Sequence, residues 1–142
     1  MPALYHIGIT VEDLDASVAF YRDVVGLREI PESSNLELSG EWFDTLTENQ
    51  GAALRVAHLD LAGTQLQLVE YTAGGGERLP LAHKQVGNPH LCIDMEDITA
   101  RHAALVADGR FKVSSIVTIA DTPIRSFYVT DPNGVLVEFI ER

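Results

Sequence analysis

The chain has 142 residues, 46% of them hydrophobic and 22% charged, which is typical of a globular protein made of one domain. Ten basic and 21 acidic residues give a formal net charge of −11, which argues against nucleic acid as a partner. No apolar run is long enough to span a membrane, and the start lacks the basic and apolar regions of a secretion signal. We therefore expect a cytoplasmic protein, in agreement with a single cysteine, Cys92, that cannot form a disulfide within the chain.

The first half of the chain shows alternating residues typical of strands and one stretch with helical spacing. The predicted elements are strands at 4–11 and 27–30, a helix at 14–25, and a hairpin of strands 54–61 and 64–71. Asp13 is the expected N-cap of the helix and Gly26 its end. The apolar residues of the helix recur at spacings of four, three and four residues, as Leu14, Val18, Tyr21 and Val25. This half is therefore predicted to be a βαβββ module.

Residues 31–51 interrupt the periodicity with Ser, Asn and Gly, and no segment of equal length occurs in the second half. They include the only tryptophan, Trp42, beside Phe43. Loops of this size in compact domains are often functional. We expect a loop that covers the mouth of a binding site or contacts a partner subunit, and that is more mobile without ligand.

A Gly-rich connector at 72–77 separates the halves, and the second half repeats the plan. Its predicted elements are strands at 90–94 and 113–119, a helix at 98–107 ended by Gly109, and strands 125–130 and 135–140 around the turn Asp131-Pro132-Asn133-Gly134. The two repeats span 1–73 and 88–142. Together they predict an α+β fold with eight strands, in a single domain over residues 1–142.

The two halves also share sequence at matching positions. One begins with His6-Ile7-Gly8-Ile9 and the other with His90-Leu91-Cys92-Ile93, and in the last strands Gln67 aligns with Glu138. Because side chains alternate along a strand, each histidine can share a face with the polar residue of its own half. Two imidazoles, an amide oxygen and a carboxylate are a suitable ligand set for a divalent ion with open positions.

His58 is another candidate near this set. If Ala62-Gly63 is a two-residue turn, His58 lies opposite Gln67 on the same face. It could then be a metal ligand, a hydrogen-bond partner of a ligand, or a residue that lines the barrel. Glu70 and Glu141 are out of phase with the site and are expected to face outward. His83 looks like a loop residue.

These features resemble the vicinal oxygen chelate superfamily, which includes glyoxalase I, methylmalonyl-CoA epimerase, extradiol dioxygenases, and the fosfomycin and bleomycin resistance proteins. The resemblance rests on His6-Ile7-Gly8-Ile9, Phe20-Tyr21-Arg22-Asp23-Val24-Val25-Gly26-Leu27 and Asp131-Pro132-Asn133-Gly134-Val135-Leu136-Val137-Glu138. It covers nearly the whole chain except residues 31–51. It implies paired βαβββ modules in a curled, glyoxalase-like mixed sheet, which forms a cup around a metal ion.

The ligand positions implied by the resemblance are His6, Gln67, His90 and Glu138, the same four residues that the internal repeat selects. This His-Gln-His-Glu set is more similar to that of the epimerase than to the His-Glu-His-Glu set of bacterial glyoxalase I. The epimerase also has a catalytic glutamate on the third strand of its first half, where this chain has Leu54-Arg55-Val56-Ala57. The expected cofactor is a divalent ion: Ni, Co, Zn, Mn, Mg or Fe.

The predicted function is that of a metal-dependent lyase or isomerase, glyoxalase-like or epimerase-like. It would remove a proton next to a carbonyl of a small substrate whose vicinal oxygens bind the metal. Glu138 is the expected catalytic base, because a carboxylate at the metal lies within reach of the substrate. Two alternatives remain open: a non-catalytic binding protein of the drug-resistance type, and a one-domain extradiol dioxygenase. The expected partners are the substrate and a second copy of the chain in a homodimer.

Overall fold

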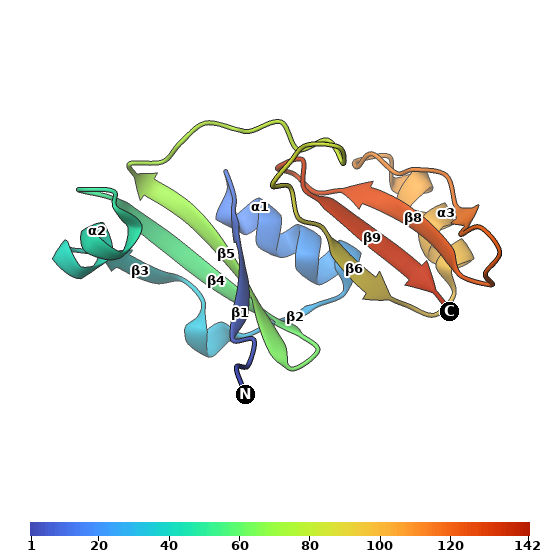
Figure 1. Ribbon diagram of the computed structural model, residues 1–142, viewed down its shortest axis with the longest axis horizontal. Helices are drawn as coiled ribbons and strands as arrows, with labels where there is room; N and C mark the ends of the chain where they lie inside the picture. The colour runs from blue at the N-terminus through green and yellow to red at the C-terminus, as the bar shows by residue number, and fades with distance from the viewer. The chain divides into compact units, whose positions relative to one another are not determined.

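The computed structural model describes residues 1–142, which form two compact units, Met1–Glu77 and Arg78–Arg142. Each unit has its own mixed β-sheet and a helix that packs against that sheet (Figure 1). This arrangement confirms the predicted α+β class. None of the helices combines the length and the apolar character needed to cross a bilayer.

The first unit contains five strands and four helical segments. In chain order these are β1 (His6–Thr10), α1 (Leu14–Ala19), η1 (Phe20–Val25), β2 (Arg28–Glu29), η2 (Pro31–Ser33), β3 (Leu36–Ser39), α2 (Glu41–Thr47), β4 (Ala53–Leu61) and β5 (Thr64–Ala73). The strands lie in the order β1-β5-β4-β2, and β3 also pairs with β4. The β1–β5 pair is parallel and the other pairs are antiparallel.

The second unit is a βαβββ module, as predicted. Its elements are β6 (Leu91–Asp94), α3 (Ile98–Asp108), β7 (Val117–Thr118), β8 (Arg125–Thr130) and β9 (Leu136–Glu141), with the strands in the order β6-β9-β8-β7. The strand predicted at 113–119 is shorter than expected and consists of β7 and one isolated bridge from Val113 to Val129. The hydroxyl of Ser114 accepts the N–H of Tyr128, which a backbone carbonyl would accept in a regular ladder.

The prediction of an irregular loop at 31–51 is wrong. The segment contains β3, which pairs with β4 from Leu36–Val56 to Ser39–Ala53, and the helix α2. Phe43 of α2 is only 4% exposed and belongs to a hydrophobic cluster with Leu54 and Val56. The chain therefore has nine strands in two sheets, one strand more than predicted.

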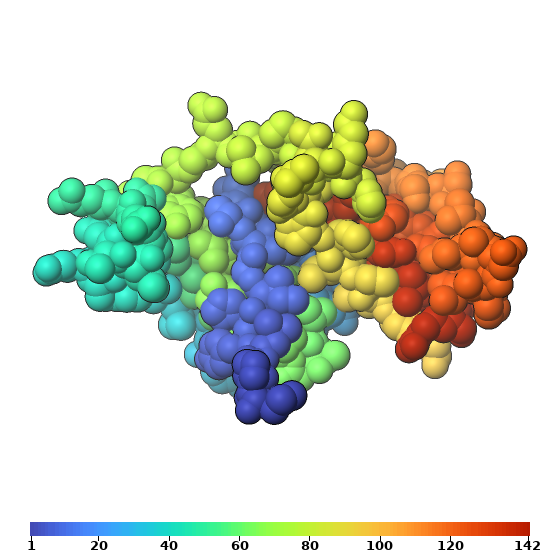
Figure 2. Space-filling model, viewed as in Figure 1, coloured from blue at the N-terminus to red at the C-terminus, as the bar shows by residue number.

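The exposed side of α2 is apolar in part. Trp42 is 56% exposed and Leu46 is 73% exposed, while the neighbouring Phe43 anchors the helix to the sheet. In Figure 2 this segment, coloured teal, projects at the surface of the first unit. Because Phe43 belongs to the core, α2 is anchored to the sheet of this unit.

The helix after β1 confirms the predicted apolar stripe. Its Asp13 cap accepts the N–H of Ala16 at 3.0 Å, and Gly26, with φ of 93°, ends the helix in the left-handed region. The second part, η1, is π-helical, and its wider turn adds Phe20 and Val24 to the buried face. All four predicted positions are buried: Leu14, Val18, Tyr21 and Val25.

In each unit the last strand is tied to the first turn of the helix by a glutamate. Glu70 Oε2 accepts the N–H of Leu14 at 2.6 Å, and Glu141 Oε2 accepts the N–H of Ile98 at 2.9 Å. Leu14 and Ile98 are both fully buried, so the carboxylates satisfy backbone groups that a helix leaves unpaired at its start. The two glutamates that are out of phase with the candidate site therefore have a structural role.

An arginine from the neighbouring strand accompanies each glutamate. Arg55 Nη1 lies 4.0 Å from Glu70, and Arg125 donates a hydrogen bond to Glu141. The bond from Arg125, together with the N–H of Ile98, lowers the pKa of Glu141 below its usual value. This contribution to stability is therefore present above the ordinary glutamate pKa and is lost as the pH falls through the lowered value.

Replacing Glu70 by alanine is expected to lower the free energy of unfolding by about 1–2 kcal/mol, because a buried N–H loses its charged acceptor. Urea titration followed by the fluorescence of Trp42, which lies in the same unit, measures this change. Glu77→Ala, in the exposed connector, is the control and should leave the midpoint unchanged. An unchanged midpoint for Glu70→Ala would show that another group satisfies Leu14.

Candidate functional site

The candidate ligands occupy matching places in the two sheets. In the first, the parallel β1–β5 pair puts Gln67 beside Gly8, two residues after His6. In the second, the parallel β6–β9 pair puts Glu138 beside Cys92, two residues after His90. The sequence repeat is thus also a repeat of strand register. Each unit offers one histidine at the start of its first strand and one oxygen donor on the strand beside it.

Glu138 is the centre of a polar cluster in the second unit. Ser126 Oγ donates to Oε1 at 2.6 Å, Tyr128 Oη donates to Oε2 at 3.3 Å, and His90 Nε2 lies 3.5 Å from Oε2. Cys92 lies beside Glu138 on the neighbouring strand β6. The side chain of Glu138 is 15% exposed and that of His90 is 36% exposed. The carboxylate is thus oriented by neutral donors and remains accessible.

The donors around Glu138 keep their protons at neutral pH. Partial burial is the main cause that raises the pKa of Cys92 to about 11, and the charge of Glu138 adds to it. Partial burial also raises the pKa of Tyr128, again with a contribution from Glu138. A thiol in this state is a hydrogen-bond donor and a poor nucleophile.

His83, predicted from the sequence to be only a loop residue, also belongs to this cluster. Its ring centroid lies 5.5 Å from that of His90 and 5.6 Å from that of Tyr128, and the last two lie 5.6 Å apart. The rings of His83, His90 and Tyr128 thus pack against one another beside Glu138. No signal in the sequence could have found His83, because it lies outside the repeat and outside any strand register.

In the first unit, Gln67 contacts His58. The two residues lie opposite each other across the β4–β5 hairpin, as predicted, and His58 is 7% exposed. Gln67 Nε2 is 3.1 Å from His58 Nε2, and His58 Nδ1 is 2.6 Å from the carbonyl oxygen of Ser33. The amide oxygen of Gln67 lies on the side of Gly8, where a Cβ atom would be 3.7 Å away from it.

The remaining candidate, His6, is exposed at the start of β1. Its ring packs edge-on against Tyr5, with 5.5 Å between the centroids. No group of three or more His, Cys, Asp or Glu side chains that could hold a metal ion forms in the structure. In the second unit the structure brings His90 within 3.5 Å of Glu138. In the first unit His6 and Gln67 lie on the adjacent strands β1 and β5, where His6 pairs with Gln65.

Mixed sheets with parallel outer pairs and one helix on each are the features of a glyoxalase-like fold, and solved structures agree. A glyoxalase family protein from Bacillus cereus superposes with a TM-score of 0.83, at 16% identity over 99% of this chain and 94% of that chain. A mutant of the fosfomycin resistance protein FosX from Listeria monocytogenes, complexed with Mn(II) and 1S,2S-dihydroxypropylphosphonic acid, gives 0.67 at 18% identity, over 98% of this chain and 91% of that one. At these identities the similarity is one of fold.

The sequence comparisons identify the family. The model of the Glyoxalase/Bleomycin resistance protein/Dioxygenase superfamily matches residues 3–139, and the chain belongs to this superfamily. A 2-epi-5-epi-valiolone epimerase from Actinomyces sp is 33% identical over 144 residues, which cover 97% of this chain and 78% of that protein. The resemblance inferred from the histidine-led strands and the Asp-Pro-Asn-Gly turn is thereby confirmed.

Proposed function

We propose that this protein is a metal-dependent isomerase that epimerises a small hydroxylated carbonyl compound by moving a proton at the carbon next to the carbonyl. The observation on which the proposal depends is the environment of Glu138. Neutral donors from Ser126 and Tyr128 orient its carboxylate without neutralising its charge, and His90 lies 3.5 Å away. The 33% identity to an epimerase favours epimerisation over lyase chemistry.

The proposal includes a divalent metal ion bound by His6, Gln67, His90 and Glu138. The donor set fits such an ion, because imidazole nitrogens and amide or carboxylate oxygens are common ligands of divalent metals. In the second unit His90 Nε2 and Glu138 Oε2 are close together, and in the first unit the oxygen of Gln67 faces the open side of Gly8. When bound, the ion would stabilise negative charge that develops on the substrate oxygens.

Glu138 is the proposed base, and no second glutamate is available in β4. In methylmalonyl-CoA epimerases the corresponding part of the first half has a catalytic glutamate. Here residues 54–57 belong to β4, and Leu54 and Val56 are buried in the hydrophobic cluster with Phe43. The proposed removal of the proton therefore relies on one carboxylate, whose orientation is set by its own sheet. Epimerisation would be completed when a proton from solvent reaches the opposite face of the same carbon.

The second unit has a pocket of about 330 Å³, and Glu138 itself is not part of its lining. Its lining includes Thr130 and Leu136, a cross-strand pair on the same sheet face as Glu138 and about 7 Å along the strands from it. Arg78 and Lys112 also line the pocket, and no acidic residue does. We propose that this pocket binds the part of the substrate beyond the reacting carbon, through hydrogen bonds from the two cations to its oxygen atoms.

The test is proton exchange in D₂O with Mn(II) and 2-epi-5-epi-valiolone, the compound for which the relative is named. We expect deuterium to enter the carbon next to the carbonyl, as measured by NMR, with no oxygen consumed. Oxygen uptake with a catechol would instead identify a dioxygenase. Tight ligand binding without exchange, with or without metal, would identify a binding protein.

A further inference from the structure

We propose that His58 is a positioning residue, which turns the amide of Gln67 so that its oxygen faces the metal site. The inference rests on the proposed role of Gln67 as a ligand. Only the oxygen of an amide binds a metal ion, so a glutamine must be held the right way round to act as a ligand. The contacts of His58 supply this constraint.

The carbonyl of Ser33 determines which nitrogen of His58 has the hydrogen. A carbonyl oxygen can only accept, so at 2.6 Å the Nδ1 atom must be the donor. In the neutral ring, Nε2 then has the lone pair and accepts a hydrogen bond from the amide nitrogen of Gln67 at 3.1 Å. A flipped amide would place its oxygen against this lone pair. The oxygen of Gln67 is therefore directed away from His58, toward the side of Gly8.

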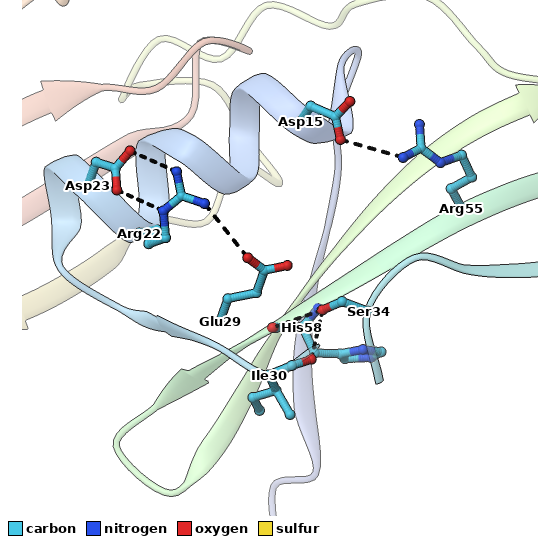
Figure 3. A network of polar contacts seen from close by, with 8 residues as sticks. All are labelled: Asp15, Arg22, Asp23, Glu29, Ile30, Ser34, Arg55 and His58. Atoms are coloured by element: carbon cyan, nitrogen blue, oxygen red, sulfur yellow. Dashed lines mark hydrogen bonds and ion pairs between the residues drawn. The ribbon is translucent and has the colours of Figure 1, made fainter. Parts of the chain in front are cut away.

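The backbone around His58 holds the ring in place (Figure 3). The N–H of His58 donates to Ser34 Oγ at 3.1 Å, and its carbonyl accepts the N–H of Ile30 at 2.8 Å. Ser34 Oγ in turn donates to the carbonyl of Ile30 at 2.8 Å. These bonds tie residues 30–34 to β4, so the Ser33 carbonyl is presented to the imidazole by a closed hydrogen-bond network.

The matching position in the second unit supports this role. His58 lies opposite Gln67, and Tyr128 lies opposite Glu138 in the corresponding hairpin. The hydroxyl of Tyr128 donates a hydrogen bond to the carboxylate of Glu138, whereas the imidazole of His58 accepts one from the amide of Gln67. Each oxygen ligand thus has a cross-strand partner of the complementary polarity. The amide nitrogen of glutamine needs an acceptor, which histidine supplies, and the carboxylate of glutamate needs a donor, which tyrosine supplies.

The test measures the affinity for Mn(II) by calorimetry on the full chain. His58→Phe keeps a ring of similar size but removes the nitrogen that accepts the hydrogen bond from Gln67. It should weaken Mn(II) binding by roughly 10–100-fold, the usual cost of losing a residue that hydrogen-bonds to a metal ligand. In Gln67→Glu both ends of the side chain are oxygens. In that background we expect His58→Phe to change the affinity by less than about threefold, because no orientation remains to be selected. His102→Phe, on α3 of the other unit, is the control and should bind as the wild type.

Two outcomes overturn the inference, and a third concerns the proposed function. An unchanged affinity in His58→Phe, with a loss in Gln67→Ala, would show that Gln67 orients itself. An equal loss in the Gln67 and Gln67→Glu backgrounds would show that His58 acts through the fold. If Gln67→Ala itself binds Mn(II) as the wild type, Gln67 is not a ligand, and the proposed ligand set fails. Circular dichroism melts of each variant confirm that the compared proteins are folded.

Discussion

Replacing Glu138 by glutamine is expected to lower the rate of proton exchange at the substrate carbon by about a thousandfold, within the range that general bases contribute. The amide cannot accept the proton. Ser126 and Tyr128 donate to different oxygens of the carboxylate, so the single oxygen of the amide can accept one of these hydrogen bonds. At the other position the hydroxyl can turn and accept a hydrogen bond from the amide nitrogen, so the side chain should keep its place. Metal binding should weaken and persist. Deuterium incorporation measured by NMR at saturating Mn(II) separates the loss of the base from the loss of metal.

Glu141→Gln is the matched control for this variant. Glu141 lies on the same strand but contacts Arg125 and the N–H of Ile98, not the cluster around Glu138. The control should reduce stability in the neutral range, where the charged carboxylate now contributes, and leave the exchange rate per folded molecule unchanged. If Glu138→Gln retains exchange within about tenfold of the wild type, another group is the base.

The fold was predictable mainly because the chain repeats itself. A single helix with an apolar stripe does not identify a fold. Two strands that each begin with a histidine and lead into a capped helix, however, indicate a module and its copy. The turn residues also made the register of the hairpin predictable. Ala62 and Gly63, with φ of 52° and 91°, form the two-residue turn that places His58 opposite Gln67. The same alternation separated Glu70 and Glu141 from Gln67 and Glu138, and the structure shows both carboxylates bound to the starts of helices.

Elements that depend on distant partners could not be predicted in this way. β3 has four residues and α2 has seven, too few for either period to be recognised. Both exist because β4 offers a free edge and a hydrophobic cluster, with Leu36 paired to Val56 and Phe43 buried beside it. His83 was missed for a related reason. The contact between its ring and the ring of His90 depends on the path of the chain before β6. Such contacts have no local signature in a single sequence.

Removing either strand-leading histidine should lower the affinity for metal by at least the roughly 10–100-fold that the loss of an outer-shell partner costs. The repeat predicts that His6→Ala and His90→Ala are similarly severe, since each removes the single imidazole of its unit from the proposed site. The metal content of protein purified from metal-supplemented medium, measured by mass spectrometry, provides the first comparison. His102→Ala controls for the loss of a histidine as such.

Thermal unfolding provides a second, independent measurement of the same prediction. A ligand that binds only the folded state stabilises it by about 2.7 kcal/mol at about a hundredfold excess over its Kd, so adding Mn(II) should raise the Tm of the wild type. EDTA should reverse this rise, and both effects should nearly vanish in the two histidine variants. A loss confined to His90→Ala would mean that the metal is bound by the cluster around Glu138 alone. In that case the matching register of His6 and Gln67 would reflect the duplicated fold without a shared site, and the proposed role of His58 would lose its basis.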